Sequence, residues 1–254
     1  MRPLSRVWYV RIVKILIVGP MVGLFLLWAF FVDNHIYEDE EEPAPSEIIP
    51  HYSPTNFEQP VGFASLEKVH NYGLAHKAVW VNVLNSNYQV LLLRRAGNLR
   101  TCPGRLSLLG EHESQEDQLH GKFGEPTARR GLKEEVLRPD DLYKAPIKHL
   151  FTSLLTISTG GRVDVQQTWF GYVVYDKPIA SVVLNATEAL PYAKFYDLGE
   201  AFRLVELHSY KFCLPDHRDT LYLKSWALLC KKYQTPSCEK VLKRVQLFDV
   251  ETDY

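Results

Sequence analysis

The sequence predicts an α/β domain, a mixed sheet covered by helices, preceded by one transmembrane helix. Three observations lead to this prediction. Residues 15–32 form an uncharged apolar run. Beyond it, β-branched and aromatic runs alternate with helical segments, which is typical of a mixed sheet covered by helices. Residues 108–137 place an arginine and paired glutamates behind a glycine-rich acidic loop. The chain of 254 residues has room for one domain of about 150–200 residues besides the apolar run.

The apolar run has the length of a membrane span. About 18 residues, each rising about 1.5 Å, nearly cross a hydrocarbon core of about 30 Å. Pro20 and the neighbouring glycines are tolerated in such helices. A cleaved signal peptide would have a shorter apolar core and a small-x-small cleavage site, which Ala29-Phe30-Phe31 does not provide. A buried core helix would show a polar face, and this run has none. We therefore predict a transmembrane signal anchor over residues 15–32.

Charge on either side of the anchor predicts its orientation. Four basic residues precede it within residues 1–14, and a block of acidic residues follows at 38–42. Because basic flanks stay cytoplasmic, residues 1–14 form a cytoplasmic tail. The protein is then a single-pass type II membrane protein whose C-terminal domain lies in the lumen of the secretory pathway or outside the cell. The net charge of −1 offers no basic footprint for nucleic acid.

Cysteines and one glycosylation triplet bear on the compartment. The cysteine count of four is even, which is compatible with an oxidising compartment and does not prove it. Cys230 and Cys238 are close enough for a local disulfide, whereas Cys102 and Cys213 need the fold to bring them together. The triplet at 185–187, Asn-Ala-Thr, is an N-glycosylation sequon, although one such triplet can arise by chance.

The soluble part begins with a predicted stem over residues 33–64. Its acidic block is followed by several prolines and little periodic apolar sequence. Proline fixes φ and removes a backbone donor, so we expect this segment to stay extended and unpacked. The predicted globular domain covers residues 65–254.

Within that domain, residues 77–83 and 88–93 read as strands joined by a turn at 85–87. A helix is predicted from Pro126 to about residue 137, because proline suits the first helical turn and Pro139 prevents continuation. Two more strands are expected at 148–157 and 168–175, joined by a turn at Gly160-Gly161. A second helix is expected at 220–233, and its predicted buried residues are Leu221, Trp226, Leu228 and Leu229.

The first of these helices carries the candidate chemistry. Residues four apart share a helix face, so Arg130 and Glu134 are neighbours. Grouped carboxylates repel one another unless a cation neutralises them, and Mg²⁺ prefers oxygen ligands. Glu134 and Glu135 are therefore candidate metal ligands that Arg130 would hold by charge-assisted hydrogen bonds. The alternative is a solvated helix whose ion pairs are ordinary surface stabilisers.

Several short motifs occur in an order that resembles the Nudix hydrolase superfamily. They are His76–Val81, Val90–Arg95, Pro103–Leu106 and Gly110–His112, followed by residues 130–135, which resemble the REUxEE core of the Nudix box. The order is similar to a subgroup with a His-Arg-x-Val strand and a Gly-Glu-His element, related in fold to isopentenyl diphosphate isomerase. The resemblance covers about residues 70–235. Isomerase activity is not expected, because that family requires a cysteine that residues 109–112 lack.

The resemblance implies a Nudix-type α/β/α sandwich and Mg²⁺-dependent (or Mn²⁺-dependent) cleavage of a phosphoanhydride bond in a nucleoside diphosphate derivative. It also implies site residues. The predicted catalytic residues are Glu134, Glu135, Arg130 and Glu188, and the predicted metal ligands are Glu134, Glu135, Glu125 and Glu111. The predicted substrate-binding residues are Arg94, Arg95 and His112. His112 has the alternative of being an ordinary hydrogen-bonding group, and strand alternation lets only one of the two arginines face the site.

Departures from the family pattern limit this interpretation. Gly131 replaces the first glutamate of the box, and Leu137 stands where the box has its glycine. Fourteen residues lie between Gly110 and Glu125, more than the family has, so residues 113–124 are an insertion. The acidic residues that could compensate for Gly131 are Glu111, Glu113, Glu116, Asp117 and Glu125.

Three functions stay open from the sequence. The first is a membrane-anchored Nudix hydrolase acting on a small nucleotide-type substrate. The second is a Nudix-fold binding or scaffold domain that has lost catalysis with the carboxylate at Gly131. The third is a structural membrane protein with an incidental helix. The first two differ in whether another acidic side chain occupies the space beside Gly131. Substrate identity, organelle and oligomeric state are not readable from the sequence.

Overall fold

The computed structural model describes residues 47–99, 102–119, 123–138, 140–159, 162–176, 182–187, 189–191, 193–213 and 218–245. The predicted cytoplasmic tail, the anchor at 15–32 and the acidic block of the stem lie outside these ranges. Within them, no helix is both long enough and apolar enough to cross a membrane.

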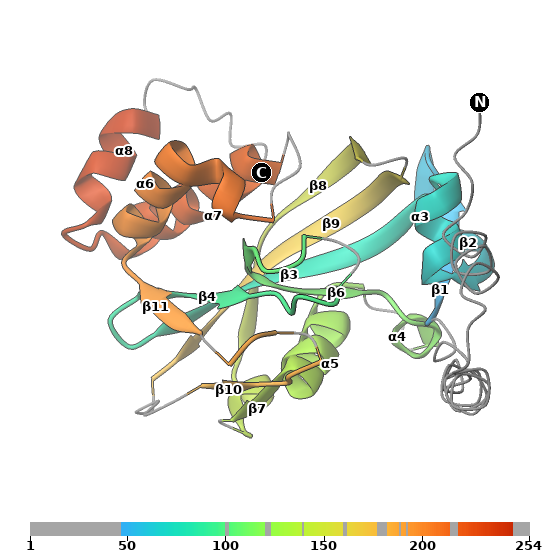
Figure 1. Cartoon of the computed structure of the whole chain (residues 1–254), viewed down its shortest axis with the longest axis horizontal. Helices are drawn as coiled ribbons and strands as arrows, with labels where there is room; N and C mark the ends of the chain where they lie inside the picture. The colour runs from blue at the N-terminus through green and yellow to red at the C-terminus, as the bar shows by residue number, and fades with distance from the viewer. Residues whose placement is uncertain are drawn as a thin grey trace, which may run out of the picture. The chain divides into compact units, whose positions relative to one another are not determined.

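A mixed sheet of seven strands forms the centre of the domain (Figure 1). Its main path runs β11 (Lys194–Tyr196), β4 (Val90–Arg94), β3 (His76–Asn85), β9 (Arg162–Tyr175) and β8 (Ile147–Thr159). The short strands β5 (Leu106–Ser107) and β6 (Leu109–His112) pair with β4 and β3. β3 and β9 run parallel, whereas the other pairs are antiparallel. The predicted mixed sheet is confirmed.

Side-chain alternation along β3 divides the core into two layers. Val79, Val81 and Val83 point to one face, where they pack with Ala128 and Leu132 of α5 (Glu125–Glu135). On the other face, Trp80 and Leu84 belong to a cluster that contains residues of α6 (Leu198–His208), α7 (Arg218–Tyr233) and α8 (Cys238–Val245). Helices thus cover both faces of the sheet, as the α/β/α prediction requires.

The predicted elements of this domain are largely confirmed. Strands lie at all four expected places, and a turn at 85–88 joins the first two, with Tyr88 N donating to Asn85 O at 2.9 Å. The predicted second helix is α7, in which Leu221, Trp226 and Leu229 are buried and Leu228 is half-buried. The predicted turn at Gly160-Gly161 lies outside the described residues.

The predicted boundary of the stem differs from the structure. Residues expected in the unpacked stem form a hairpin of β1 (Ile48–Ser53) and β2 (Asn56–Ser65), and α3 (Leu66–Tyr72) follows it. Ile49 and Tyr52 are buried, and Tyr52 N donates to Ala75 O next to β3. Prolines are tolerated here because both strands of a two-stranded sheet are edges, where a missing N–H breaks no ladder. The described globular part therefore begins near residue 47.

The helix α5 ends two residues before the predicted end at 137. Val136 N still donates to Leu132 O, but Val136 has extended dihedrals and begins β7 (Val136–Arg138). That strand pairs with β10 (Val183–Leu184) in a separate two-stranded sheet. Cross-strand pairing, rather than Pro139, thus ends the helix.

Both disulfides that the sequence allows are formed. Cys102 and Cys213 join the loop after β4 to the segment before α7, across 111 positions of the chain. Cys230 and Cys238 join α7 to α8 across eight positions. No cysteine is left free.

Candidate functional site

The site is organised around the guanidinium of Arg130 on α5. Its Nη1 donates to Glu134 Oε2 at 3.2 Å, as expected for residues four apart. Its Nε and Nη2 lie 3.3 and 3.2 Å from Asp117 Oδ2, and Nη2 also donates to the carbonyl of His112. Glu111 Oε1 lies 3.5 Å from Nη2. Arg130 therefore orients acidic groups from β6, from α5 and from the inserted loop, the role that the motif implied.

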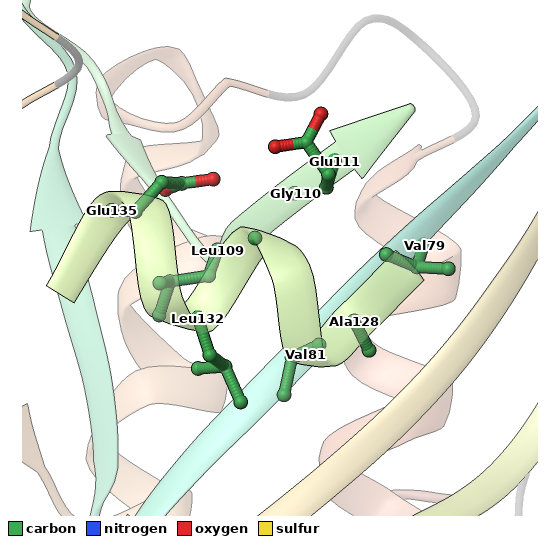
Figure 2. Close-up of a pocket in the computed structure, with 9 residues that line it drawn as sticks. Val79, Val81, Leu109, Gly110, Glu111, Ala128, Leu132 and Glu135 are labelled. Atoms are coloured by element: carbon green, nitrogen blue, oxygen red, sulfur yellow. The ribbon is translucent and has the colours of Figure 1, made fainter. Parts of the chain in front are cut away.

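Glu111 occupies the space that Gly131 leaves. A Cβ added to Gly131 would lie 2.8 Å from Glu111 Cβ, 3.2 Å from its Cγ and 3.6 Å from its Oε2. Figure 2 shows the Glu111 side chain on β6, on the same side of α5 as the Glu135 carboxylate and opposite to Leu132. Both glutamates and Gly131 line one narrow, mostly apolar crevice between α5 and the sheet, called the groove below. A carboxylate thus stands beside Gly131, and a different element of the fold supplies it.

The environment of Glu111 disfavours its charge. Burial raises the pKa of this carboxyl to about 7, and the carboxylates of Glu47 and Glu134 act in the same direction. Arg130 and the backbone N–H of His112, which donates to Oε1 at 2.8 Å, oppose the rise. Burial is therefore the main cause of the shift, and it outweighs the neighbouring guanidinium.

The predicted metal ligands do not all converge. Glu135 is half-buried and lines the groove, whereas the Glu134 side chain is 54% exposed and pairs with Arg130. Glu125 accepts from Arg129 on the neighbouring turn and does not line the groove, and its role as a metal ligand stays a prediction. The helix turns by about 100° per residue, so the 125–129 pair lies on another flank than the 130–134 pair.

The inserted loop contributes to the site through Asp117. This residue lies on the short helix α4 (Gln115–Leu119), and Asp117 Oδ2 accepts from Ser114 N at 3.0 Å while Ser114 Oγ accepts from Asp117 N at 3.1 Å. The reciprocal bonds fix the carboxylate, which is 6% exposed, against Arg130. The described part of the insertion therefore contributes a buried carboxylate to the site.

A group of three histidines lies next to the groove. His70 of α3, His76 at the start of β3 and His112 at the end of β6 each offer one ring nitrogen, and these atoms lie within 4.8 Å of one another. His112 also belongs to a second group of potential metal ligands, with Glu47 and Glu111. Among the described residues, the groups able to hold a cation thus share His112 and adjoin Glu111.

The chemistry of the three histidines suits a divalent metal ion. His76 is fully buried, and its Nδ1 lies 3.1 Å from the Leu74 carbonyl, which fixes the proton on Nδ1 and directs Nε2 away from the backbone. Asp164 Oδ1 lies 3.4 Å from that Nε2. Three imidazoles with nearby carboxylates form a donor set suited to first-row divalent metals.

Arg94 and Arg95 are not among the residues that line the groove. Arg94, at the end of β4, is exposed, and the backbone of Arg95 bridges to Ala189 while its N–H donates to Arg105 O. Glu188 lies outside the described residues. His112 belongs to both groups of potential metal ligands, and its predicted role in substrate binding stays a prediction.

Three residues of the site are absent from the predicted set: Glu47, His70 and His76. Asp117 is predicted only as one of the acidic residues that could compensate for Gly131. All four come from separate elements, and no local spacing joins His70 to His112 or Asp117 to Arg130. The signal in the sequence was the composition of the segments: two histidines flank the Gly-Leu-Ala turn before the first strand, and a third follows Glu111.

Comparison with known proteins identifies a shared fold. No family model and no curated protein matches the chain. The crystal structure of DR0079 from Deinococcus radiodurans aligns with a TM-score of 0.51 and 12% identity, over 69% of this chain and 97% of that one. A Nudix hydrolase from Alicyclobacillus acidocaldarius aligns over 61% and 91%, at 17% identity and a TM-score of 0.43. A MutT protein from Methanosarcina mazei aligns over 68% and 96%, at 17% identity and 0.39.

The chain is thus similar in fold to DR0079, and proteins named as Nudix hydrolases are among the other structures that resemble it. Scores below 0.5 carry no weight of their own, and identities this low speak to the fold and not to activity. What the site can do has to come from its own residues.

Proposed function

We propose that the protein is a membrane-anchored, divalent-cation-dependent hydrolase of the Nudix type, which cleaves a phosphoanhydride bond in a nucleoside diphosphate derivative. The observation that carries this proposal is the position of Glu111. Its carboxylate lies over Gly131, beside Glu135 and against Arg130. A carboxylate in that place is what an active Nudix-type site needs and what the box at 130–135 lacks.

Each residue has a role that follows from its position. Glu111 and Glu135 would hold the cation on the groove side, with His112 and its neighbouring imidazoles as further donors. When bound, Mg²⁺ or Mn²⁺ neutralises charge on the phosphate oxygens and lowers the pKa of bound water. Arg130 orients Glu111 and Glu134, and Asp117 positions Arg130. Arg94 is an exposed arginine, and a guanidinium can bind a phosphate bidentately.

The membrane anchor and the lumenal orientation are part of the proposal. They rest on the apolar run at 15–32, on the basic flank before it and on the acidic block after it. The two disulfides support an oxidising compartment for the domain. Nucleoside diphosphates and nucleotide sugars are the substrate class that glycosylation generates in such a lumen.

The test is hydrolysis by the full chain in detergent, with a panel of nucleoside diphosphate derivatives and Mg²⁺ or Mn²⁺. We expect cation-dependent release of a nucleoside monophosphate or phosphate. Glu111→Gln should lower turnover by a factor on the order of 100, because it removes the relocated carboxylate. Glu125→Gln is the matched control, since Glu125 is on the same helix and does not line the groove. Equal losses in both variants would contradict the proposal.

The binding or scaffold domain is the alternative, and one observation favours it. Glu134, a ligand expected from the box, is exposed and already engaged by Arg130. If a folded protein binds the nucleotides in a cation-dependent way but releases no product from any of them, this alternative holds.

A further inference from the structure

A short turn beside the site carries the sequon at 185–187. It follows β10, and the backbone N–H of Asn185 donates to the carbonyl of Glu135 at 2.8 Å. Ala189 N donates in turn to the Asn185 carbonyl at 3.0 Å. The asparagine is therefore held at the C-terminal end of α5, one hydrogen bond from a residue that lines the groove.

The side chain of Asn185 is held in one orientation. Its Oδ1 accepts from Thr187 N at 3.2 Å and from Thr187 Oγ1 at 2.9 Å, which is an Asx turn closed by the threonine of the sequon. The carbonyl side of the amide thus faces Thr187. Nδ2 makes one long contact, 3.4 Å to the carbonyl of Glu134, which engages at most one of its two hydrogens.

The turn is also accessible. Ala186 and Thr187 are exposed, and Asn185 is half-buried. Glycosylation of Asn-x-Ser/Thr requires a surface site, because the added group is bulky and solubilising. The two disulfides of the domain indicate the oxidising compartment, which for a secretory protein is also where sugar is added.

We propose that Asn185 carries an N-linked oligosaccharide, attached to the turn at the C-terminal end of α5. In the reaction, Asn185 Nδ2 forms a bond to C1 of the first sugar of a lipid-linked oligosaccharide diphosphate. The C1–O bond to the diphosphate breaks, the lipid diphosphate leaves with the bonding pair, and Nδ2 loses one proton. This inference rests on the proposed lumenal orientation and is independent of hydrolase activity.

The experiment expresses the full chain in eukaryotic cells with an active secretory pathway and treats the purified protein with a peptide-N-glycosidase. After treatment, the wild type should migrate faster in gel electrophoresis by the mass of one glycan. Mass spectrometry should then find aspartate at position 185. Asn185→Gln and Thr187→Ala should lack the shift. Thr187→Ser, which keeps the hydroxyl, is the matched control and should retain it.

Folding is monitored by disulfide formation, since all four cysteines are paired in the folded domain. If the wild type forms its disulfides and shows no shift, the inference is overturned. A cytosolic domain, unglycosylated and with reduced cysteines, also overturns it, together with the proposed topology. Hydrolysis is measured separately, so a glycosylated protein without turnover would refute the proposed function and leave this inference standing.

Discussion

Two arginine–glutamate pairs on α5 are alike locally and differ in their surroundings. Glu125 with Arg129, and Arg130 with Glu134, are both four residues apart, and both glutamates are 54% exposed. Arg129 otherwise donates to the carbonyls of Tyr143 and Ala145, around the 3₁₀ turn η1 (Leu142–Lys144). Arg129 thus joins α5 to the turn η1 through hydrogen bonds to backbone carbonyls.

Arg130 instead meets carboxylates that come from other parts of the chain. Glu111 and Asp117 both face its guanidinium, and their side chains are 14% and 6% exposed. An ion pair at helical spacing is thus no mark of a site. What distinguishes Arg130 from Arg129 is its contact with two largely buried carboxylates, those of Glu111 and Asp117. These contacts are tertiary and do not follow from spacing along the helix.

The largest difference should appear when each arginine loses its charge. Arg130→Met leaves Glu111 and Asp117 partly buried without their cation, and breaking a buried pair costs about 3–5 kcal/mol. Arg129→Met removes a more exposed pair and two carbonyl contacts, and we expect about 1 kcal/mol. Denaturant unfolding followed by tryptophan fluorescence measures both. Similar losses in the two variants would remove the distinction between the pairs.

A second difference concerns pH. The pKa of Glu111 is raised from 4.5 to about 7, so the folded protein retains a proton that the unfolded chain releases in this window. Its stabilising contribution is therefore complete below pH 4.5 and is lost as pH rises to about 7. Without divalent cations, wild type should lose up to about 3 kcal/mol relative to Glu111→Gln across this window. Parallel pH profiles of the two proteins would contradict the assignment.

A smaller effect is expected from Gly131→Ala. In an unhindered helix this substitution stabilises by about 1 kcal/mol. Here the new Cβ would lie 2.8 Å from Glu111 Cβ, so β6 or α5 must shift. Overpacking of this kind costs about 1–3 kcal/mol, so we expect a net loss in thermal unfolding. A clear gain in stability would mean that Glu111 does not occupy this space.

The smallest effects on stability are expected from the exposed glutamates. Glu134→Gln and Glu125→Gln each weaken one surface pair and should each cost less than about 1 kcal/mol. The two variants should differ in turnover. Glu134→Gln should lower it because it disturbs Arg130, whereas Glu125→Gln should leave it unchanged. Parallel thermal and kinetic measurements on the two variants check this, and equal turnover would place Glu134 outside the chemistry.

Much of the fold was readable from the sequence because its signals are local. β-branched runs predicted the strands, and the proline at 126 predicted the start of α5. Local signals also caused the misplaced boundary: prolines near residues 50 and 60 suggested an unpacked stem, yet a hairpin of two edge strands accepts them. The end of α5 depended on the pairing of β7 with β10, about 45 residues away in the chain, which no local rule encodes.

The site was predictable to the extent that it lies on one helix. Arg130, Glu134 and Glu135 follow from spacing, and Glu111 from its place near the opening of the motif. His70, His76 and Asp117 reach the site from three other elements, so their convergence appears in three dimensions alone. Glu125 has the right residue type on the right helix, but it pairs with Arg129 and does not line the groove.

The central claim is that Glu111 supplies the carboxylate that Gly131 lacks, and exchanging the two residues tests it most directly. The measurement is Mn²⁺ affinity and turnover for Glu111→Gly, Gly131→Glu and the double variant, beside the wild type. We predict that each single variant weakens Mn²⁺ binding by about tenfold or more and that the double variant recovers most of it, because one carboxylate again fills one space. The claim would be contradicted if the double variant lost as much Mn²⁺ affinity as the two single variants lose together.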